Sequence, residues 1–368
     1  MFILLILLRL LPALLTAYWV LATSAVVVTL LPLPLPQGFK DAVRLSAARG
    51  KLWSTRPKSL GRLNDLAVPQ AWFSHFYAVG TACCLLLLLL ATPLPPLASS
   101  DAQQLTALAL FPSKAEAVQY ISLWVFLLHL LRRLLETCCL MVYPSTARMH
   151  VIAYVFGLSY YMVAPLSLLN TLSGLPLTRV GAHENTGFLG LSQGDVSLEG
   201  GLGSFLASLL PRAAAAPAAF ASAWAQGSAW QVASGVGLTM IGFTLQFYSH
   251  WVLAALAARG ISRLQRSKRG GLDGDSEGSK GHNEDASMYS IPRGGAFEWI
   301  SCPHYAGEII IYAGLLLLTW PHSPNVFLML GWVVTNLVLA AGATQQWYHA
   351  AFPHSFPKSR RALVPFVF

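Results

Sequence analysis

Four ionisable side chains interrupt a long apolar stretch near the middle of the chain. His129, Arg132, Arg133 and Glu136 lie within ISLWVFLLHLLRRLLETCCLMVY, the last three at i+3, i+4 and i+7 from His129. This spacing places all four on one face of a helix. Three charged residues on a lipid-facing stripe would cost roughly 7–10 kcal/mol at the centre of a bilayer. We therefore expect the face to point inward, either as a structural Arg–Glu pair or as part of a ligand site.

A second polar group is predicted towards the end of another apolar stretch. Thr239, Gln246 and His250 share a helical face, and Tyr248 and Ser249 lie beside them. A single histidine in such a place is usually a packing residue. A cluster of Gln, Tyr, Ser and His can instead donate hydrogen bonds to a polar ligand. Both interpretations are open at this point.

The motif CPHYAGE opens a further apolar helix. His304 and Glu308 share a face at i, i+4, and Tyr305 lies three residues before Glu308. Pro303 suits the first turn, and Ser301 is the predicted N-cap. Tyr, His and Glu are groups that donate or relay protons. The His-x-x-x-Glu spacing also suggests a metal, but two ligands without a third predict none.

The C-terminal segment is basic and then apolar. Gln345 and Tyr348 precede Lys358, Arg360 and Arg361, and the chain ends in LVPFVF. Basic side chains here could hold the phosphates of a soluble cofactor. Attraction to anionic lipid headgroups explains them equally well.

The elements that must position these residues are membrane helices. Of the 368 residues, 55% are hydrophobic and 11% charged, against about 25% charged in a soluble domain. We predict an all-α polytopic membrane protein with about seven transmembrane helices in one bundle. The expected spans are Leu10–Leu31, Trp72–Leu90, Gln119–Tyr143, Val151–Leu169, Gln231–Ala258, Ile300–Trp320 and Val326–Ala343. The first is read as a retained helix and not as a cleaved signal peptide. Residues 202–230 are interpreted as a surface or interfacial segment.

The distribution of Lys and Arg predicts the orientation. With seven spans, eighteen basic residues fall on one side of the bilayer and three on the other. The positive-inside rule makes the richer side cytosolic, so the N-terminus is predicted to be lumenal and the C-terminus cytosolic. Because the basic residues lie between spans, the net charge of +9 indicates topology, and no nucleic acid is expected as a partner.

Several familiar signatures are missing from the sequence. The five cysteines form no C-x-x-C pair, and four of them lie in apolar runs, so packed free thiols are expected. No G-x-G-x-x-G opens a helix after a strand, and there is neither a G-x-S-x-G elbow nor a P-loop. The insertions at about 174–230 and 264–288 suggest no chemistry.

Several stretches together resemble the steroid 5-alpha-reductase family. The matching blocks are IPRGGAFEWISCPHYAGE, ending at Glu308, and FPKSRRALVPFVF at the C-terminus. The polyprenal reductase branch fits best, because Val68-Pro69, WFSHFY over 72–77 and LRRLLE over 131–136 look like that branch. The resemblance divides the chain into an N-terminal membrane region, 1–230, and a 3-oxo-5-alpha-steroid 4-dehydrogenase-like reductase domain, 231–368.

The resemblance implies an endoplasmic-reticulum enzyme that binds NADPH near the cytosolic face. The branch reduces the alpha-isoprene double bond of polyprenal, giving dolichal on the way to dolichol for N-glycosylation. Carried over by position, the residues at or beside NADPH contacts are Gln246, His250, Tyr289, His304, Glu308, Tyr348 and Arg360. The steroid enzymes have Asn, Asp and Asn at Gln246, His250 and His304. Their catalytic tyrosine aligns with Leu130, so that role is unfilled here.

The candidate chemistry is delivery of a hydride to the beta carbon of an enal, with a donor at the carbonyl oxygen and a proton for the alpha carbon. We expect His129, Arg133, Glu136 and His75 to border the aldehyde. Glu308 and Tyr305 would organise the nicotinamide end; Arg360, with Lys358, would meet a cofactor phosphate. A steroid or enoyl-thioester reductase is the nearest alternative, and a seven-span receptor or transporter is an alternative of a different class.

Overall fold

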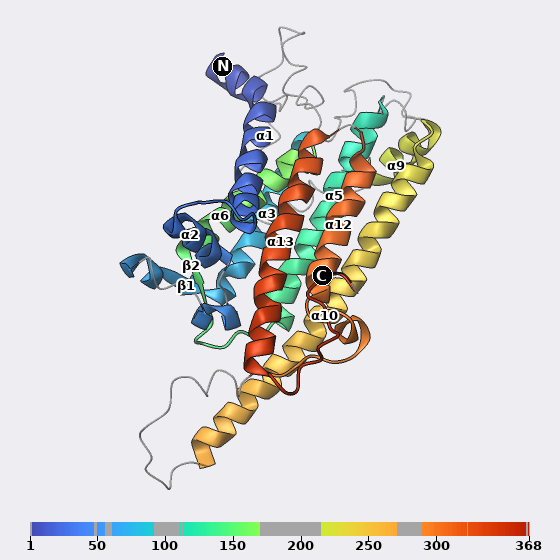
Figure 1. Cartoon of the computed structure of the whole chain (residues 1–368). Helices are drawn as coiled ribbons and strands as arrows, with labels where there is room; N and C mark the ends of the chain where they lie inside the picture. The colour runs from blue at the N-terminus through green and yellow to red at the C-terminus, as the bar shows by residue number, and fades with distance from the viewer. Residues whose placement is uncertain are drawn as a thin grey trace, which may run out of the picture.

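The computed structural model describes residues 2–47, 50–55, 61–91, 111, 113–169, 215–270, 289–321, 323–365 and 367. Each predicted span coincides with a helix. These are α1 (Phe2–Leu30), α3 (Phe73–Ala91), α5 (Lys114–Leu135), α6 (Val151–Ser167), α10 (Ala229–Gly270), α12 (Pro303–Thr319) and α13 (Pro324–Ala351). The helices run side by side as one bundle (Figure 1).

Four of these helices are long and apolar enough to cross a membrane, namely α1, α3, α10 and α13. The chain is therefore an integral membrane protein. Helices α6 and α12 are 17 residues each, which is at the short end of what spans a bilayer. Helix α5 has 22 residues but includes the charged face described above. Seven crossings thus stay a prediction.

Glycines set the closest helix pair, α10 against α12. A Cβ atom at Gly242 would lie 2.7 Å from the carbonyl oxygen of Gly307, and one at Gly314 would lie 2.7 Å from the carbonyl oxygen of Gly235. Small residues let membrane helices approach backbone to backbone. Gly235 also lies at this contact, whereas Gly237 faces open space. This contact holds Gln246 of α10 beside Glu308 of α12.

Helix α5 contacts both α3 and α12, while α1 packs along α13. One hydrophobic core joins these helices and includes Trp19, Phe126, Ile311 and Val333. A capping box at Ser113 and Glu116 fixes where α5 begins.

The segment before α10 differs from the prediction in part. Residues 202–214 lie outside the described residues, but α9 (Ala215–Ala225) packs against α5. Ala219 and Ala223 are fully buried there, and the hydroxyl of Ser222 donates to the carbonyl of Phe111 at 2.7 Å. The alanines permit this close approach, so α9 belongs to the bundle, with Trp224 on its exposed side.

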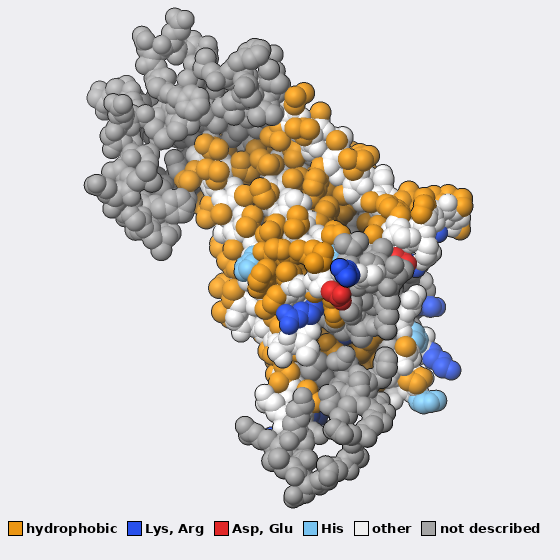
Figure 2. Space-filling view, turned by 90° about the vertical axis from the view of Figure 1, so that its left-hand side faces the viewer, with side chains coloured by type: hydrophobic (Ala, Val, Ile, Leu, Met, Phe, Trp, Pro, Cys, Tyr) orange, Lys and Arg blue, Asp and Glu red, His pale blue; other side chains and the backbone are white. Residues whose placement is uncertain are grey.

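Short elements cover the end of the bundle that has the basic loops. They are α2 (Gln37–Ala47), the 3-10 helices η1 (Gly50–Thr55), η2 (Gly61–Asp65), η3 (Gln70–Trp72) and η8 (Gly295–Glu298), and the antiparallel pair β1 (Ala67–Pro69) and β2 (Arg148–His150). The tail pairs with the segment ahead of α12, since Ser301 N donates to Arg361 O at 2.8 Å. Figure 2 shows a broad hydrophobic face with Lys and Arg gathered towards its lower part.

Two local predictions are wrong. Cys302, not Ser301, is the N-cap of α12, because the Ser301 hydroxyl donates instead to Gln345 of α13. All five cysteines are free as predicted, but Cys138 and Cys139 are exposed and not packed. Both lie where α5 becomes a π-helix (Glu136–Leu140) and leaves the core.

Candidate active site

The polar face of α5 converges on Glu136, the first residue of the π-helix. Its carboxylate accepts hydrogen bonds from Arg132 and from Arg133. The Thr137 hydroxyl donates to the carbonyl of Arg133 at 2.9 Å. Arg133 and Glu136 are 8% and 3% exposed, so the predicted inward orientation is confirmed. A π-turn is rare and often occurs at functional sites.

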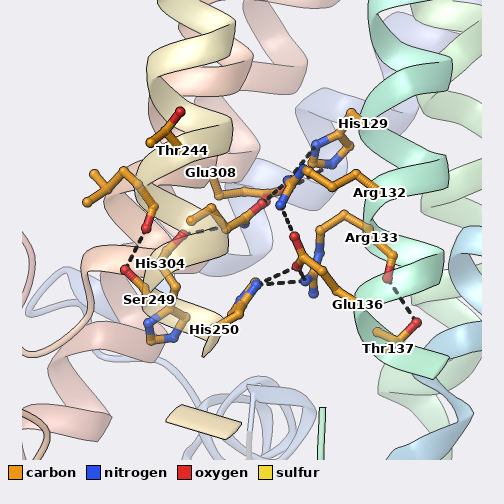
Figure 3. A network of polar contacts seen from close by, with 12 residues as sticks. His129, Arg132, Arg133, Glu136, Thr137, Thr244, Ser249, His250, His304 and Glu308 are labelled. Carbon is orange, nitrogen blue, oxygen red and sulfur yellow. Dashed lines mark hydrogen bonds and ion pairs between the residues drawn. The ribbon is translucent and has the colours of Figure 1, made fainter. Parts of the chain in front are cut away.

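Glu308 of α12 faces the side chains of α5 (Figure 3), and Gln246 of α10 contacts both. The amide oxygen of Gln246 accepts from Arg132, and its amide nitrogen donates to Glu308. His129 Nε2 points at the same carboxylate, 3.5 Å from its second oxygen. Gln246 therefore couples an arginine of α5 to a carboxylate of α12.

His250 joins the network one turn further along α10. Its Nδ1 atom lies 2.7 Å from Glu136 Oε2 and 2.8 Å from Arg133 Nη1. A guanidinium only donates and a carboxylate only accepts. We therefore assign the proton of a neutral His250 to Nδ1, which donates to Glu136 and leaves Nε2 as an acceptor.

The charges of the network balance. Arg132 and Arg133 face Glu136 and Glu308, which makes two positive and two negative groups. His129 is also assigned neutral, because its Nδ1 atom lies 3.3 Å from the Arg132 guanidinium and accepts from it. A set of paired charges with no net charge is the form in which ionised groups are tolerated inside a membrane protein.

A cavity of about 530 Å³ opens beside this network. Its polar wall comes from α5, α10 and α12 and includes Arg133, Gln246, His250, His304 and Glu308. Its apolar wall comes from α1, α6 and α13, with Val26, Phe156, Trp332, Val333 and Leu337 among its residues. The cavity therefore presents hydrogen-bonding groups to one part of a ligand and a hydrocarbon-like surface to another.

Lys51 of η1 lies at the basic end of the same cavity. Its ammonium nitrogen is 3.6 Å from the ring centroid of Tyr348 and 4.9 Å from that of Trp347. Burial lowers the pKa of Lys51 from its ordinary value to about 7. A cation in this place is suited to an anionic group that enters from the side of the basic loops.

The predicted site residues separate into three groups. Those that line the cavity are Arg133, Gln246, His250, Tyr289, His304, Tyr305, Glu308 and Tyr348. His129 and Glu136 lie behind the wall and hold it by the contacts above. His75, Lys358 and Arg360 are not among the lining residues.

The three residues outside the lining have distinct surroundings. His75 is exposed on α3 and pairs with Tyr154 at 2.9 Å. Lys358 is exposed. Arg360 is fully buried, donates to Pro292 O at 3.0 Å and lies 3.8 Å from the Glu298 carboxylate.

Several cavity residues were not singled out from the sequence, among them Lys51, Tyr77, Tyr160 and Tyr161. Tyr77 accepts from Nη2 and Nε of Arg133 at 2.8 and 3.1 Å, and its ring lies 5.0 Å from that of Tyr161. Aromatic residues are common in apolar helices, so composition gives no signal. Lys51 lies in the basic loop before α3, where the positive-inside rule explains a cation equally well.

Comparisons with known proteins show which chains this one resembles. The family model described as 3-oxo-5-alpha-steroid 4-dehydrogenase matches residues 215–368. Polyprenal reductase 1 of Oryza sativa subsp. indica is 30% identical, with 95% of each chain covered. Polyprenal reductase 1 of Arabidopsis thaliana is 28% identical over 95% of each chain, and human polyprenal reductase is 27% identical over 96% of each.

The chain belongs to the steroid 5-alpha-reductase family, in its polyprenal reductase branch. Steroid 5-alpha-reductase DET2 of Arabidopsis thaliana is 36% identical, but only over 30% of this chain and 35% of its own. The similarity to the polyprenal reductases therefore also includes α3 and α5, which contribute Tyr77 and Arg133 to the cavity. In this member of the family, Leu130 is fully buried, and a Cβ atom at Gly80 would lie 3.0 Å from it.

Proposed function

We propose that this chain reduces the alpha-isoprene double bond of polyprenal with NADPH, giving dolichal on the way to dolichol for protein N-glycosylation. The observation that carries the proposal is the two-sided cavity. Its polar wall suits an aldehyde and a nicotinamide, and its apolar wall suits a prenyl chain. The similarity to polyprenal reductases over 95% of this chain supports the same substrate.

NADPH fits the residues that surround the cavity. Lys51 supplies a cation at the basic end. Arg360 lies outside the cavity lining, and within the described part of the chain its buried Nε and Nη2 atoms make no hydrogen bond, with Nη2 3.8 Å from Glu298 Oε2. Gln246 and Glu308 offer an amide and a carboxylate, which pair with a carboxamide. We assign Lys51 and Arg360 to the phosphates, and Gln246 and Glu308 to the nicotinamide end.

Bound NADPH would supply the hydride for the beta carbon of the enal. The protein must then stabilise negative charge at the aldehyde oxygen and let a proton reach the alpha carbon. Arg133 lines the cavity and is held by Glu136 and Tyr77. It provides a fixed positive charge beside the oxygen. His250 and His304 also line the cavity, and their imidazole rings are groups that can pass a proton.

The location follows from the same assignment. We place the enzyme in the endoplasmic-reticulum membrane, with the N-terminus lumenal and the C-terminus cytosolic. The cavity end formed by Lys51, Tyr289 and Tyr348 lies among the basic loops, which are predicted to be cytosolic and therefore accessible to soluble NADPH. The lipid enters between helices on the side of the apolar wall.

The test is an assay of the purified full-length protein in detergent with polyprenal and NADPH deuterated at the transferable position. We expect dolichal with one deuterium at the beta carbon, detected by mass spectrometry. A 3-oxo-4-ene steroid and an enoyl thioester, each added at equal concentration, measure specificity. If the enzyme reduces the steroid or the thioester in preference to polyprenal, that compound class is the substrate instead. The absence of any NADPH oxidation, together with no quenching of tryptophan fluorescence by NADPH, would refute the proposal.

A further inference from the structure

We infer that Tyr77 of α3 is the hydrogen-bond donor to the aldehyde oxygen, a residue that touches the reacting group. This inference rests on the proposed function. Tyr77 lines the cavity and is 8% exposed. Its hydroxyl oxygen accepts hydrogen bonds from Arg133 Nη2 at 2.8 Å and from Arg133 Nε at 3.1 Å.

The direction of the phenolic proton follows from these two bonds. A guanidinium has no acceptor, so Arg133 can only donate to the Tyr77 oxygen. The hydroxyl proton must therefore point away from Arg133, towards the side where Tyr77 lines the cavity and meets its hydrogen-bond partner Tyr161. A phenol held in this way is a preorganised donor with a cation directly behind it.

The other cavity tyrosines lack this support. Tyr160 and Tyr161 pack edge to face, with ring centroids 4.8 Å apart, and Tyr161 pairs with Tyr77 itself. The Tyr305 ring lies tilted against His304, with centroids 4.1 Å apart. Among the described residues, the hydrogen bonds of Arg133 to a phenol all go to Tyr77. The position of charge therefore favours Tyr77 as the group that faces a developing oxyanion.

The packing around Leu130 explains how the Tyr77 phenol of α3 can take the role that a tyrosine at position 130 has in the steroid enzymes. A Cβ atom at Gly80, one turn after Tyr77, would lie 3.0 Å from Leu130 Cδ2 and 3.2 Å from Tyr161 Cδ1. Tyr77 also contacts Tyr161, with ring centroids 5.0 Å apart. Leu130 and Tyr161 thus both lie against Gly80, one turn from Tyr77. The phenol that is missing at position 130 is supplied from the adjacent helix.

The reaction balances with Tyr77 as a donor that keeps its proton. The hydride and its electron pair add to the beta carbon. The π pair of the carbon–carbon double bond then joins the alpha carbon to the carbonyl carbon, and the π pair of the carbonyl moves to the aldehyde oxygen. Tyr77 holds this oxygen by its hydrogen bond while the Arg133 cation stabilises the charge. One proton from water then adds to the alpha carbon, and the aldehyde is restored. NADPH is the reductant, and the sum is enal, NADPH and one proton giving saturated aldehyde and NADP⁺.

The experiment compares Tyr77→Phe with Tyr18→Phe in the full-length protein. Tyr18 also has a partnered hydroxyl within the bundle, 3.0 Å from Ser159, but it does not line the cavity. We expect Tyr77→Phe to lower kcat by about 10²–10³-fold, the usual effect of removing one oxyanion donor. NADPH binding should be unchanged, and Tyr18→Phe should keep at least half of the activity. Retention of more than a third of the wild-type kcat by Tyr77→Phe would overturn the inference.

A second variant guards against a folding defect. Difluorotyrosine incorporated at position 77 keeps the shape and makes the phenol more acidic. The fall of kcat at high pH should then move to lower pH than in the wild type, a shift that a purely structural tyrosine does not cause. An unmoved profile would overturn the inference.

The two proposals fail in different ways. If the wild type reduces another enal or enone but not polyprenal, only the substrate is wrong, and Tyr77 is tested on the accepted compound. If the wild type reduces no such compound, both proposals fall.

Discussion

Replacing Glu136 with glutamine removes one negative charge from the bundle interior and nearly preserves side-chain shape. Glu136 is 3% exposed and accepts from both Arg132 and Arg133. The substitution therefore changes a set of two positive and two negative charges into one with a net charge of +1. It also leaves two guanidinium groups facing a neutral amide.

The magnitude follows from the cost of an unpaired buried charge. Breaking a buried ion pair by removing one partner costs about 3–5 kcal/mol. This corresponds to roughly 10²–10⁴-fold in the folding equilibrium. The Arg132 side chain is 15% exposed, so part of its charge can be hydrated, and we expect the lower half of that range.

The assay is the free energy of unfolding in mixed micelles, measured by tryptophan fluorescence for a double-mutant cycle. Glu136→Gln should lower stability by about 3 kcal/mol. Adding Arg132→Gln restores neutrality while Arg133 keeps Tyr77 as a partner. The double variant should recover at least half of the loss, because contacting residues are not additive. Wild-type stability of Glu136→Gln, or strict additivity in the cycle, would refute the reasoning.

Three further outcomes are expected. Gly307→Ala places a methyl group 2.9 Å from Gln246 N; thermal unfolding should show a loss of about 1–3 kcal/mol from overpacking, whereas Gly237→Ala, with nothing within 4 Å, should be neutral or stabilising. Wild-type stability of the Gly307→Ala variant would contradict the close α10–α12 contact. Burial holds the pKa of Lys51 near 7, so its ammonium is present below that pH and lost above it. NADPH affinity, measured by fluorescence quenching, should therefore fall by up to about tenfold per unit as pH rises above 7, and Lys51→Met should bind more weakly and lose this dependence; an unchanged slope would exclude Lys51. Glu308→Gln keeps a hydrogen-bonding group but removes the charge opposite His129; the polyprenal assay should show at least a tenfold lower kcat/KM, and full activity would remove Glu308 from the site.

The sequence determined which side chains must be buried. The spacing of His129, Arg132, Arg133 and Glu136 puts them on one helical face, and the cost of charge in hydrocarbon turns that face inward. The same reasoning selected Gln246 and Glu308. These predictions succeed because helical periodicity is a local property, and the membrane adds a strong and simple constraint.

Tertiary structure decided which faces meet. The glycine contact of α10 with α12 brings Gln246 to Glu308, and the packing of α3 against α5 brings Tyr77 to Arg133. Ser301 donates to Gln345 of α13 and does not cap α12, and His75 is exposed on α3. Such pairings depend on contacts between residues far apart in the chain, which local spacing does not specify. The sequence alone therefore predicts the buried charges of α5, whereas the contact of the Tyr77 phenol with Arg133 is set by the packing of the helices.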